Sequence, residues 1–442
     1  MVKTSWFYYF LRLLIYPIHY FYYKKIVLTF AEKPNRNEPI IFVANHQNAL
    51  MDALAIIYGQ PLQSVFLTRA DIFKRRAIKY FLTKMLMLPV YRIRDGADSL
   101  KNNDVIFQTC VDILKAKRRL GLFPEGMHNH RRTILPLKKA VPRIAFLAEE
   151  SSNWTLDLKI IPVGIYYDDY FNARSVLQLN FGKPLLVNSY KDLFKENEGK
   201  AMIALRDDMF NAIKPLTIDI QNSDYYEMYD GVRFIYNSKM RNQLTLTRNT
   251  QKNIMKAAQK IIAKLDTKFE TSKEQFDVLQ SQVASYNKLL SKLKLVDSIF
   301  EKENYSWLNI GFNYLLLVLF FPVFVYGYVN NFAVLRVPNI FNKKIKDRQF
   351  HSSVRFGLSL FCFPVFYFLQ TIIVACCVNS WWIKYVYFVS LPISVIYYDV
   401  YKKWNKSVNQ KRLYNLKMSD NDLKTAIQLR KLIIQNVDNL FL

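Results

Sequence analysis

The sequence contains few glycines and few cysteines. Of its 442 residues, 11 are glycine and 4 are cysteine. No cysteine pair has a zinc-like spacing with histidine and no disulfide framework can be recognised, which argues against a disulfide-stabilised or zinc-finger fold. Each glycine is informative in such a chain, because glycine marks a turn or a close backbone approach.

A cleavable signal peptide is also absent from the sequence pattern. The stretch Trp6–Phe30 is aromatic and apolar, but Arg12, Lys24 and Lys25 interrupt it and no small-residue cleavage site follows. We therefore expect residues 1–34 to form an N-terminal segment that lies in a membrane–water interface, with its basic residues near anionic headgroups.

Acidic residues are scarce relative to basic ones. Lys and Arg number 62 against 35 Asp and Glu, a net charge of +27, and aromatic residues make up 15% of the chain. The charge predicts an anionic partner. Aromatic residues beside cations fit a membrane interface or single-stranded nucleic acid.

Long uncharged stretches dominate the C-terminal part. Ser306–Leu335 and Phe356–Ile383 contain no charged residue, and each exceeds the roughly 20 residues that a membrane span needs. A third run, 385–398, is shorter. A buried core helix is the alternative interpretation. The basic residues of 336–355 and of the tail after Tyr401 predict that both face the cytoplasm.

This charge distribution predicts a membrane topology. The second and third runs form a hairpin that turns near 379–382. The first run is a re-entrant or interfacial element bent at Pro322, or a hairpin of its own.

Residues 255–293 show apolar residues at alternating steps of three and four, which is typical of one apolar stripe on a helix. One long helix and a helical hairpin both fit. The stripe predicts a packing surface against the rest of the chain or against a second copy in a homo-oligomer. A helix lying on the membrane is the alternative.

Residues up to about 218 alternate between short apolar runs and helical segments. This alternation predicts an α/β domain with a mainly parallel sheet flanked by helices, followed by a helical region and a C-terminal membrane helical segment. The expected parts are 1–34, 35–218, 219–305, 306–400 and 401–442. The expected strands are Ile40–Ala44, Val65–Thr68, Leu88–Arg92, Leu120–Phe123, Ile160–Ile165 and Leu177–Phe181.

His46 follows the first expected strand, at its carboxyl end, where α/β folds place reactive groups. An imidazole there can take a proton from an alcohol. Asp52 is the nearest carboxylate that could orient it, and the two meet only if His46 lies in the turn before the helix. Taken alone, a structural histidine explains the pattern equally well.

Glu125 and Gly126 follow another expected strand, after Phe123 and Pro124. Backbone N–H groups at such a turn can hold an oxyanion or a phosphate. An ordinary strand-to-helix turn is the alternative.

Together these blocks resemble the glycerolipid acyltransferase superfamily, which includes glycerol-3-phosphate and lysophosphatidic acid acyltransferases. The resembling blocks are His46 to Asp52, Pro89 to Arg94, Phe123 to Gly126, Leu135 to Ala140, Ile161 to Ile165 and Phe181 to Pro184. The longer His–Asp spacing resembles the fungal glycerol-3-phosphate/dihydroxyacetone-phosphate acyltransferases.

The resemblance implies residue roles. His46 and Asp52 would be catalytic, and the substrate would be bound by Arg94, Glu125, Gly126, Lys138 and Pro162. After the glycine the family usually has Thr-Arg-Ser, whereas this chain has Met127, His128 and Asn129. Arg131 or Arg132 is expected to replace the lost arginine.

The implied function is a membrane-bound O-acyltransferase of phospholipid biosynthesis. It would move a fatty acyl group from acyl-CoA or acyl-ACP to glycerol 3-phosphate or 1-acylglycerol 3-phosphate, with no further cofactor. No metal site is expected, because His128 and His130 lack a third ligand and adjoin two arginines.

The expected partners are membrane lipids, the thioester donor and the phosphorylated acceptor, and not nucleic acid. The expected location is a membrane, the bacterial inner membrane rather than the endoplasmic reticulum, with the catalytic domain facing the cytoplasm. A non-catalytic lipid-binding protein that keeps the fold is the alternative, although it would have no need of His46, Asp52, Glu125 and Gly126.

Overall fold

The structure is a computed structural model that describes residues 6–74, 76–91 and 101–442. The chain divides into two compact units. The first contains residues 1–219 together with 342–360, and the second contains residues 220–341 together with 361–442. The stretch 342–360 therefore belongs to the first unit although it lies far along the chain.

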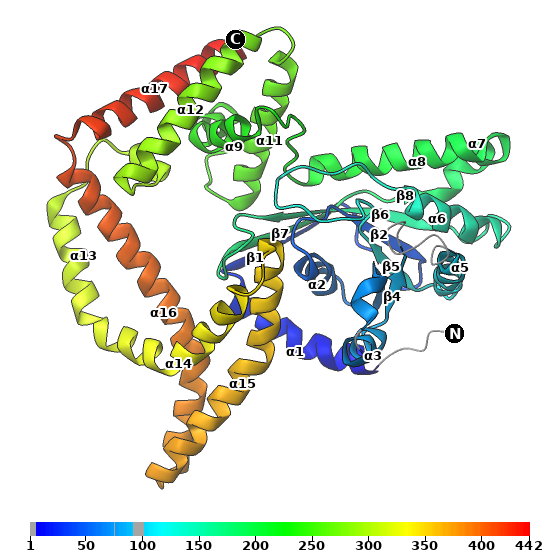
Figure 1. The fold of residues 1–442 in the computed structure, drawn as a ribbon, viewed down its shortest axis with the longest axis horizontal. Helices are drawn as coiled ribbons and strands as arrows, with labels where there is room; N and C mark the ends of the chain where they lie inside the picture. The colour runs from blue at the N-terminus through cyan, green and yellow to red at the C-terminus, as the bar shows by residue number, and fades with distance from the viewer. Residues whose placement is uncertain (1–5, 75, 92–100) are drawn as a thin grey trace. The chain divides into compact units, whose positions relative to one another are not determined.

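An eight-stranded sheet forms the centre of the first unit (Figure 1). Its strand order is β1-β7-β6-β2-β5-β3-β4, with β8 paired to β6. The strands are β1 (Lys25–Phe30), β2 (Ile40–Ala44), β3 (Ser64–Arg69), β4 (Met87–Val90), β5 (Arg119–Leu122), β6 (Lys159–Tyr167), β7 (Val176–Phe181) and β8 (Leu185–Leu186).

The sheet is mainly parallel. Strands β6, β2, β5, β3 and β4 are joined by parallel pairings, whereas β7 and β8 run antiparallel to β6. The predicted α/β domain is thus confirmed, and the carboxyl ends of the parallel strands meet at one edge of the sheet. Strand β1, which pairs in parallel with β7, was not predicted, because its residues had been assigned to the interfacial segment.

Two apolar layers cover the sheet. Alternate residues of β2 point to opposite faces, as strand geometry requires: Ile40 and Phe42 pack in one cluster, and Ile41 and Val43 in the other. The first cluster contains residues of α1 and α2, and the second contains residues of α5, α6 and α8. The helices of this unit are α1 (Trp6–Tyr22), α2 (Leu50–Gly59), α3 (Arg76–Lys84), α5 (Asn102–Lys115), α6 (Ala140–Glu150), α7 (Lys191–Glu196) and α8 (Glu198–Ile213).

Helix α1 is buried on one side only. Leu11 and Ile15 pack in the core, whereas Trp6 and Leu13 are 76% and 71% exposed. An apolar face that is left uncovered over a whole helix is typical of an interaction surface.

The second unit is helical, as predicted. Residues 255–293 fall in two successive helices with a break at 269–272, so they do not form one long helix. The helices are α9 (Tyr226–Ile235), α10 (Asn237–Gln243), α11 (Gln251–Lys268), α12 (Lys273–Leu293), α13 (Trp307–Leu319), α14 (Phe321–Asn342), α15 (His351–Cys377), α16 (Trp381–Leu416) and α17 (Asn421–Phe441).

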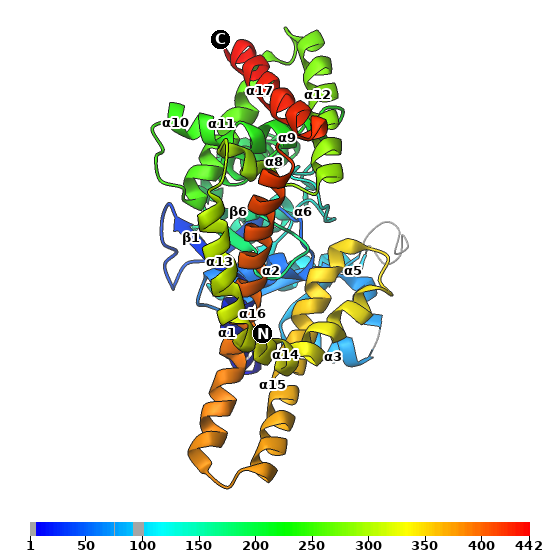
Figure 2. The same cartoon turned by 90° about the vertical axis from the view of Figure 1, so that its left-hand side faces the viewer.

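One described helical stretch, Arg348–Cys377, is long and apolar enough to cross a membrane. Helices α13 and α14 meet at 53° and pass the same test together as one bent element. The bend lies next to Pro322, where the sequence predicted it. After residue 377 the chain turns and α16 returns beside α15 (Figure 2).

Polar side chains join these apolar helices. The amide of Asn331 on α14 is fully buried. It donates to the hydroxyl of Ser394 on α16 over 2.8 Å, and its oxygen accepts the Tyr367 hydroxyl of α15 over 2.6 Å. Hydrogen bonds of this kind, between apolar helices, fix their packing partners.

Candidate active site

His46 lies in the turn between β2 and α2, at the carboxyl edge of the sheet. The residue before it, Asn45, is fully buried and exchanges two hydrogen bonds with the backbone of Ile165 on β6, over 2.9 and 2.7 Å. These bonds tie the end of β2 to its neighbour. The turn that carries His46 therefore starts from a fixed point.

His46 and Asp52 are in contact. The Nδ1 atom of His46 lies 2.9 Å from Oδ2 of Asp52, which is in the first turn of α2. Asp52 is fully buried, whereas the His46 side chain is 16% exposed. Because Nδ1–H donates to the carboxylate, Nε2 of the neutral ring is left as the proton acceptor.

Several donors hold the Asp52 carboxylate. Its Oδ2 also accepts the N–H groups of Gln47 and Asn48 over 2.8 and 2.7 Å, and its Oδ1 accepts the Tyr167 hydroxyl over 2.9 Å. Burial, then the nearby Asp52, raises the pKa of Tyr167 well above its usual value, so that hydroxyl stays a donor. Donors therefore hold the carboxylate at both of its oxygens.

The turn between His46 and Asp52 contains a strained residue. Ala49, which precedes α2, has φ 45° and ψ −124°, a conformation that residues with a side chain rarely adopt. At Ala49 the backbone changes direction between His46 and Asp52, which are six positions apart. As a result His46 stays outside the helix, where its ring can reach Asp52.

Glu125 lies beneath the same turn. Its Oε1 accepts the backbone N–H of His46 over 3.0 Å, and the side chain is 1% exposed. Burial raises the pKa of Glu125 well above its usual value, against the opposing effect of the His46 and Leu135 N–H groups. Glu125 thus positions the His46 turn from inside the fold.

Gly126 follows with φ 72°, a conformation that favours glycine. Its N–H donates to the carbonyl of Phe123 over 3.1 Å, and Asn129 donates to the carbonyl of His46 over 3.3 Å. The chain from Phe123 to Asn129 therefore wraps around the His46 turn.

Two rings contact the imidazole of His46. Phe123 stacks on it with 4.3 Å between ring centroids and 17° between planes. His128 meets it edge-on, at 5.4 Å and 76°. Burial, and next the neighbouring His46, lowers the pKa of His128.

The other residues that the sequence predicts to bind substrate lie in different parts of the chain. Lys138 is exposed and its Cγ would lie 3.6 Å from a Cβ added to Gly126, so it flanks the turn. Arg94 lies outside the described residues. Pro162 lies inside β6, opposite Val43, and its carbonyl accepts the N–H of Gly182 over 2.8 Å.

Arg132 is hydrogen-bonded to the backbone and has a structural role. It is 6% exposed, and its guanidinium donates to the carbonyls of Tyr167 and Asp168 over 2.8 and 3.2 Å. It holds the end of β6. Of the two replacements that the sequence offered for the missing family arginine, this one is already committed to the backbone.

Arg69 was missed by the sequence analysis. It ends β3 at the same carboxyl edge, forms an ion pair with Asp71 over 2.5 Å, and is close enough to His128 to oppose protonation of that ring. The signal that could have found it is its place at a strand end. Tyr167 could have been found in the same way.

No group of three or more His, Cys, Asp or Glu side chains that could hold a metal ion occurs among the described residues.

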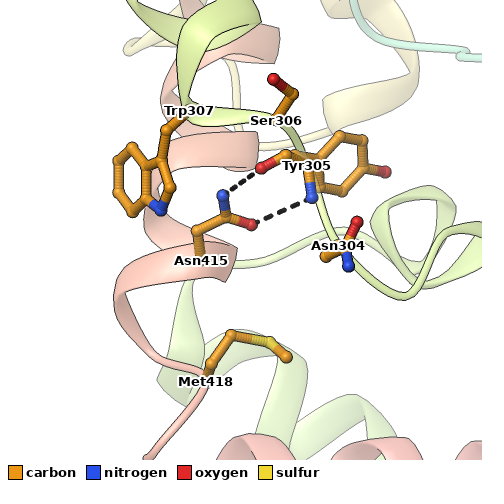
Figure 3. A pocket seen from close by; sticks show the side chains of 6 residues that line it. All are labelled: Asn304, Tyr305, Ser306, Trp307, Asn415 and Met418. Atoms are coloured by element: carbon orange, nitrogen blue, oxygen red, sulfur yellow. Dashed lines mark hydrogen bonds between the residues drawn. The ribbon is translucent and has the colours of Figure 1, made fainter.

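A separate pocket of about 360 Å³ lies in the second unit. It is lined by uncharged residues, and Asn415 and the backbone of Tyr305 exchange hydrogen bonds beside it (Figure 3). Without an imidazole or a carboxylate, this pocket lacks a proton acceptor for acyl transfer. Its lining residues are Asn304, Tyr305, Ser306, Trp307, Asn415 and Met418.

Residues 25–166 match the family model Acyltransferase. The match spans the sheet edge that carries His46, Asp52, Glu125 and Gly126. Residues 25–166 form an acyltransferase domain.

Two curated relatives align with the acyltransferase domain. Glycerol-3-phosphate O-acyltransferase 2 of Saccharomyces cerevisiae is 26% identical over 141 residues, 32% of this chain and 19% of that protein. 1-acyl-sn-glycerol-3-phosphate acyltransferase BAT2, chloroplastic, of Brassica napus is 27% identical over 133 residues, 30% of this chain and 35% of that protein. The chain thus spans a minor part of the length of either relative.

Among solved structures, the 1-acyl-sn-glycerophosphate acyltransferase PlsC from Thermotoga maritima is similar to 47% of this chain. The two share 18% sequence identity with a TM-score of 0.33, and the similarity covers 78% of that protein.

Proposed function

We propose that this protein transfers a fatty acyl group from a thioester, acyl-CoA or acyl-ACP, to a hydroxyl of glycerol 3-phosphate or 1-acylglycerol 3-phosphate. The observation that carries the proposal is the contact between His46 and the buried Asp52, at the carboxyl edge of an acyltransferase domain. The identities of the two curated relatives support a glycerol phosphate acceptor.

The reaction begins with proton transfer to Nε2 of His46. The acceptor oxygen then forms a bond to the thioester carbon, and a tetrahedral oxyanion results. Collapse of this intermediate breaks the C–S bond, and the imidazolium returns its proton to the departing thiolate. Asp52 stabilises the imidazolium and holds the tautomer, as a carboxylate does in hydrolase triads.

Backbone N–H groups beside the turn are suited to stabilise the oxyanion. The N–H of Gly126 is already bonded to Phe123. The N–H groups of the next two residues, Met127 and His128, make no hydrogen bond within the part of the chain that the structure describes. Donors fixed before the reaction are typically the largest single contribution to acyl-transfer catalysis.

Cations at the same edge would bind the acceptor phosphate. Arg69 and Lys138 are the described candidates, and Arg94 remains a prediction from the sequence. An arginine can grip a phosphate with two parallel hydrogen bonds, whereas a lysine acts as a point charge. Replacing Arg69 with Gln should raise the acceptor KM and leave kcat nearly unchanged.

We further propose that the protein works at a membrane, with its catalytic domain on the cytoplasmic side. The uncovered apolar face of α1 and the apolar stretch 348–377 support the membrane contact. The basic residues of 336–355 and of the tail after Tyr401 support the cytoplasmic side. A long acyl chain is poorly soluble in water, so the donor and a 1-acyl acceptor are both drawn from a lipid surface.

The test uses the full-length protein in nanodiscs. Labelled palmitoyl-CoA or palmitoyl-ACP is offered with glycerol 3-phosphate or with 1-acylglycerol 3-phosphate, and labelled lipid is extracted. Product should form with at least one pair, and His46→Ala should lower the rate by about 10³-fold or more. If no pair gives product, or if His46→Ala keeps full activity, the proposal is wrong.

A further inference from the structure

The segment 342–360 packs on the catalytic side of the acyltransferase domain, although it follows the domain by more than a hundred residues. It includes the end of α14, the short helix η6 (Arg348–Phe350) and the first turns of α15, and it belongs to the first compact unit. Its side chains contact the His46 turn, or residues next to it in the fold, at three separate points.

The first point is His128. The ring of Phe350 meets the ring of His128 edge-on, with 5.0 Å between centroids and 83° between planes. The Oδ2 atom of Asp347 lies 3.9 Å from Nε2 of His128. Since His128 itself meets His46 edge-on, the three rings of Phe350, His128 and His46 form a continuous row.

The second point is Asn48. The hydroxyl of Ser352 donates to Oδ1 of Asn48, and both side chains are buried. Asn48 in turn donates its backbone N–H to the Asp52 carboxylate over 2.7 Å. Ser352 therefore holds a residue that holds the partner of the catalytic imidazole.

The third point is the loop after β6. Arg355 donates to the carbonyl of Phe171 over 2.6 Å, and the guanidinium of Arg348 lies 4.9 Å from the centre of the Phe171 ring. The preceding residue, Tyr170, donates its hydroxyl to the side chain of Gln47 over 2.7 Å. Through Phe171 and Tyr170 the segment is therefore linked to Gln47, which lies between His46 and Asn48 in the turn.

We propose that Phe350 and Ser352 of segment 342–360 support the catalytic site, and that His128 is a positioning residue through which Phe350 fixes the ring of His46. This inference rests on the proposed acyl transfer. Asp52 fixes the ring at Nδ1 and Phe123 covers it by stacking, while His128 limits its tilt. A catalytic group must keep its direction within about 10–20°, and a ring with one fixed atom still tilts.

The protonation state of His128 agrees with this role. His128 is 11% exposed, and burial and His46 lower its pKa, while Asp347 and Asp52 oppose that change and Arg69 adds to it. His128 therefore favours its neutral form. It restrains the neighbouring ring without repelling the imidazolium that forms.

The test compares variants of the full-length protein in the transfer assay. Phe350→Ala should lower kcat by about 10- to 100-fold, the loss that a small misplacement causes, with little change in either KM. Phe350→Tyr keeps the ring and should restore most of the rate. Lys346→Ala, an exposed neighbour on the same loop, is the matched control and should keep wild-type kinetics.

A double-mutant cycle separates positioning from general loss of structure. If Phe350 acts through His128, the double variant with His128→Ala and Phe350→Ala should be no slower than His128→Ala alone. Additive losses, or an active Phe350→Ala variant, would overturn the inference. Should Phe350→Ala fail to fold, Asp347→Asn, which alters an exposed side chain, takes its place in the cycle.

The two proposals fail in different ways. A wild-type chain that acylates none of the acceptors would overturn the proposed function. A wild-type chain that is active while Lys346→Ala and Phe350→Ala lose the same fraction of kcat would overturn the role of His128 alone.

Discussion

Oδ2 of Asp52 is shared by Nδ1 of His46 and by the backbone N–H groups of Gln47 and Asn48, all within 2.9 Å. One oxygen thus fixes both the ring and the backbone on which the ring stands. The other oxygen, bonded to Tyr167, prevents the carboxylate from rotating. The position of Nδ1 therefore depends on this one buried side chain.

Asp52→Asn should abolish most of the activity while the fold persists. An amide has one acceptor oxygen, and its NH₂ group cannot accept from Nδ1–H, so the ring takes the wrong tautomer. We expect kcat to fall by roughly 10⁴-fold, the size of effect known for the equivalent change in a Ser-His-Asp triad. Steady-state rates beside circular dichroism spectra check this, and a loss under tenfold would contradict the assigned role.

Tyr167→Phe should reduce kcat more modestly. The change removes the donor to Oδ1 of Asp52 without altering the shape of the site, and a hydrogen bond to a charged group contributes about 1.5–3 kcal/mol. We expect a loss of roughly tenfold or more in kcat. Tyr166→Phe, the neighbour on the opposite face of β6, is the control and should behave as wild type.

Gly126→Ala tests the left-handed turn. A Cβ at this position would lie 3.6 Å from Cγ of Lys138 and nothing nearer, so space is available, but φ is +72°. An L-residue there costs about 1–2 kcal/mol. We expect a matching loss in the free energy of unfolding together with slower transfer. Gly357→Ala, in a helix with no neighbour within 4 Å, should cause no loss of stability.

His19 should make the protein less stable in acid. Burial lowers the pKa of His19 from 6.5 to about 4, so the folded state keeps the ring neutral while the unfolded chain protonates it. Stability is therefore full above pH 6.5 and falls as the pH drops toward 4, by about 3 kcal/mol for this ring. In His19→Gln, the melting temperature should fall less steeply between pH 7 and pH 4 than it does in the wild type. The exposed His130→Gln variant should keep the wild-type slope.

The sequence predicted the parts of the site that are local in the chain. His46 and Asp52 lie six positions apart beside a strand, and Phe123 to Gly126 follow another strand, so periodicity and turn chemistry located both. Most central strands were predicted for the same reason, because a fully buried parallel strand is a short apolar run. These features need no knowledge of distant contacts.

The features that the sequence did not predict depend on contacts between residues far apart in the chain. Strand β1 is half-buried and follows a run of aromatic residues, so its pattern merged with that of α1. Ser352 and Phe350 reach Asn48 and His128 from the far end of the chain, and nothing in their neighbourhood marks them. His128 itself was considered only as a metal ligand, since its role depends on a ring contact that spacing cannot predict.

Every residue of β1 is paired with β7, from Lys25 opposite Val176 to Phe30 opposite Phe181. A shortened protein that starts after residue 30, made to remove the aromatic N-terminus and improve solubility, would leave β7 as an open edge. Unpaired edges of this kind recruit other chains. Such a truncation should therefore aggregate, whereas one that begins just before Lys25 keeps β7 paired and leaves the half-buried β1 as the edge strand.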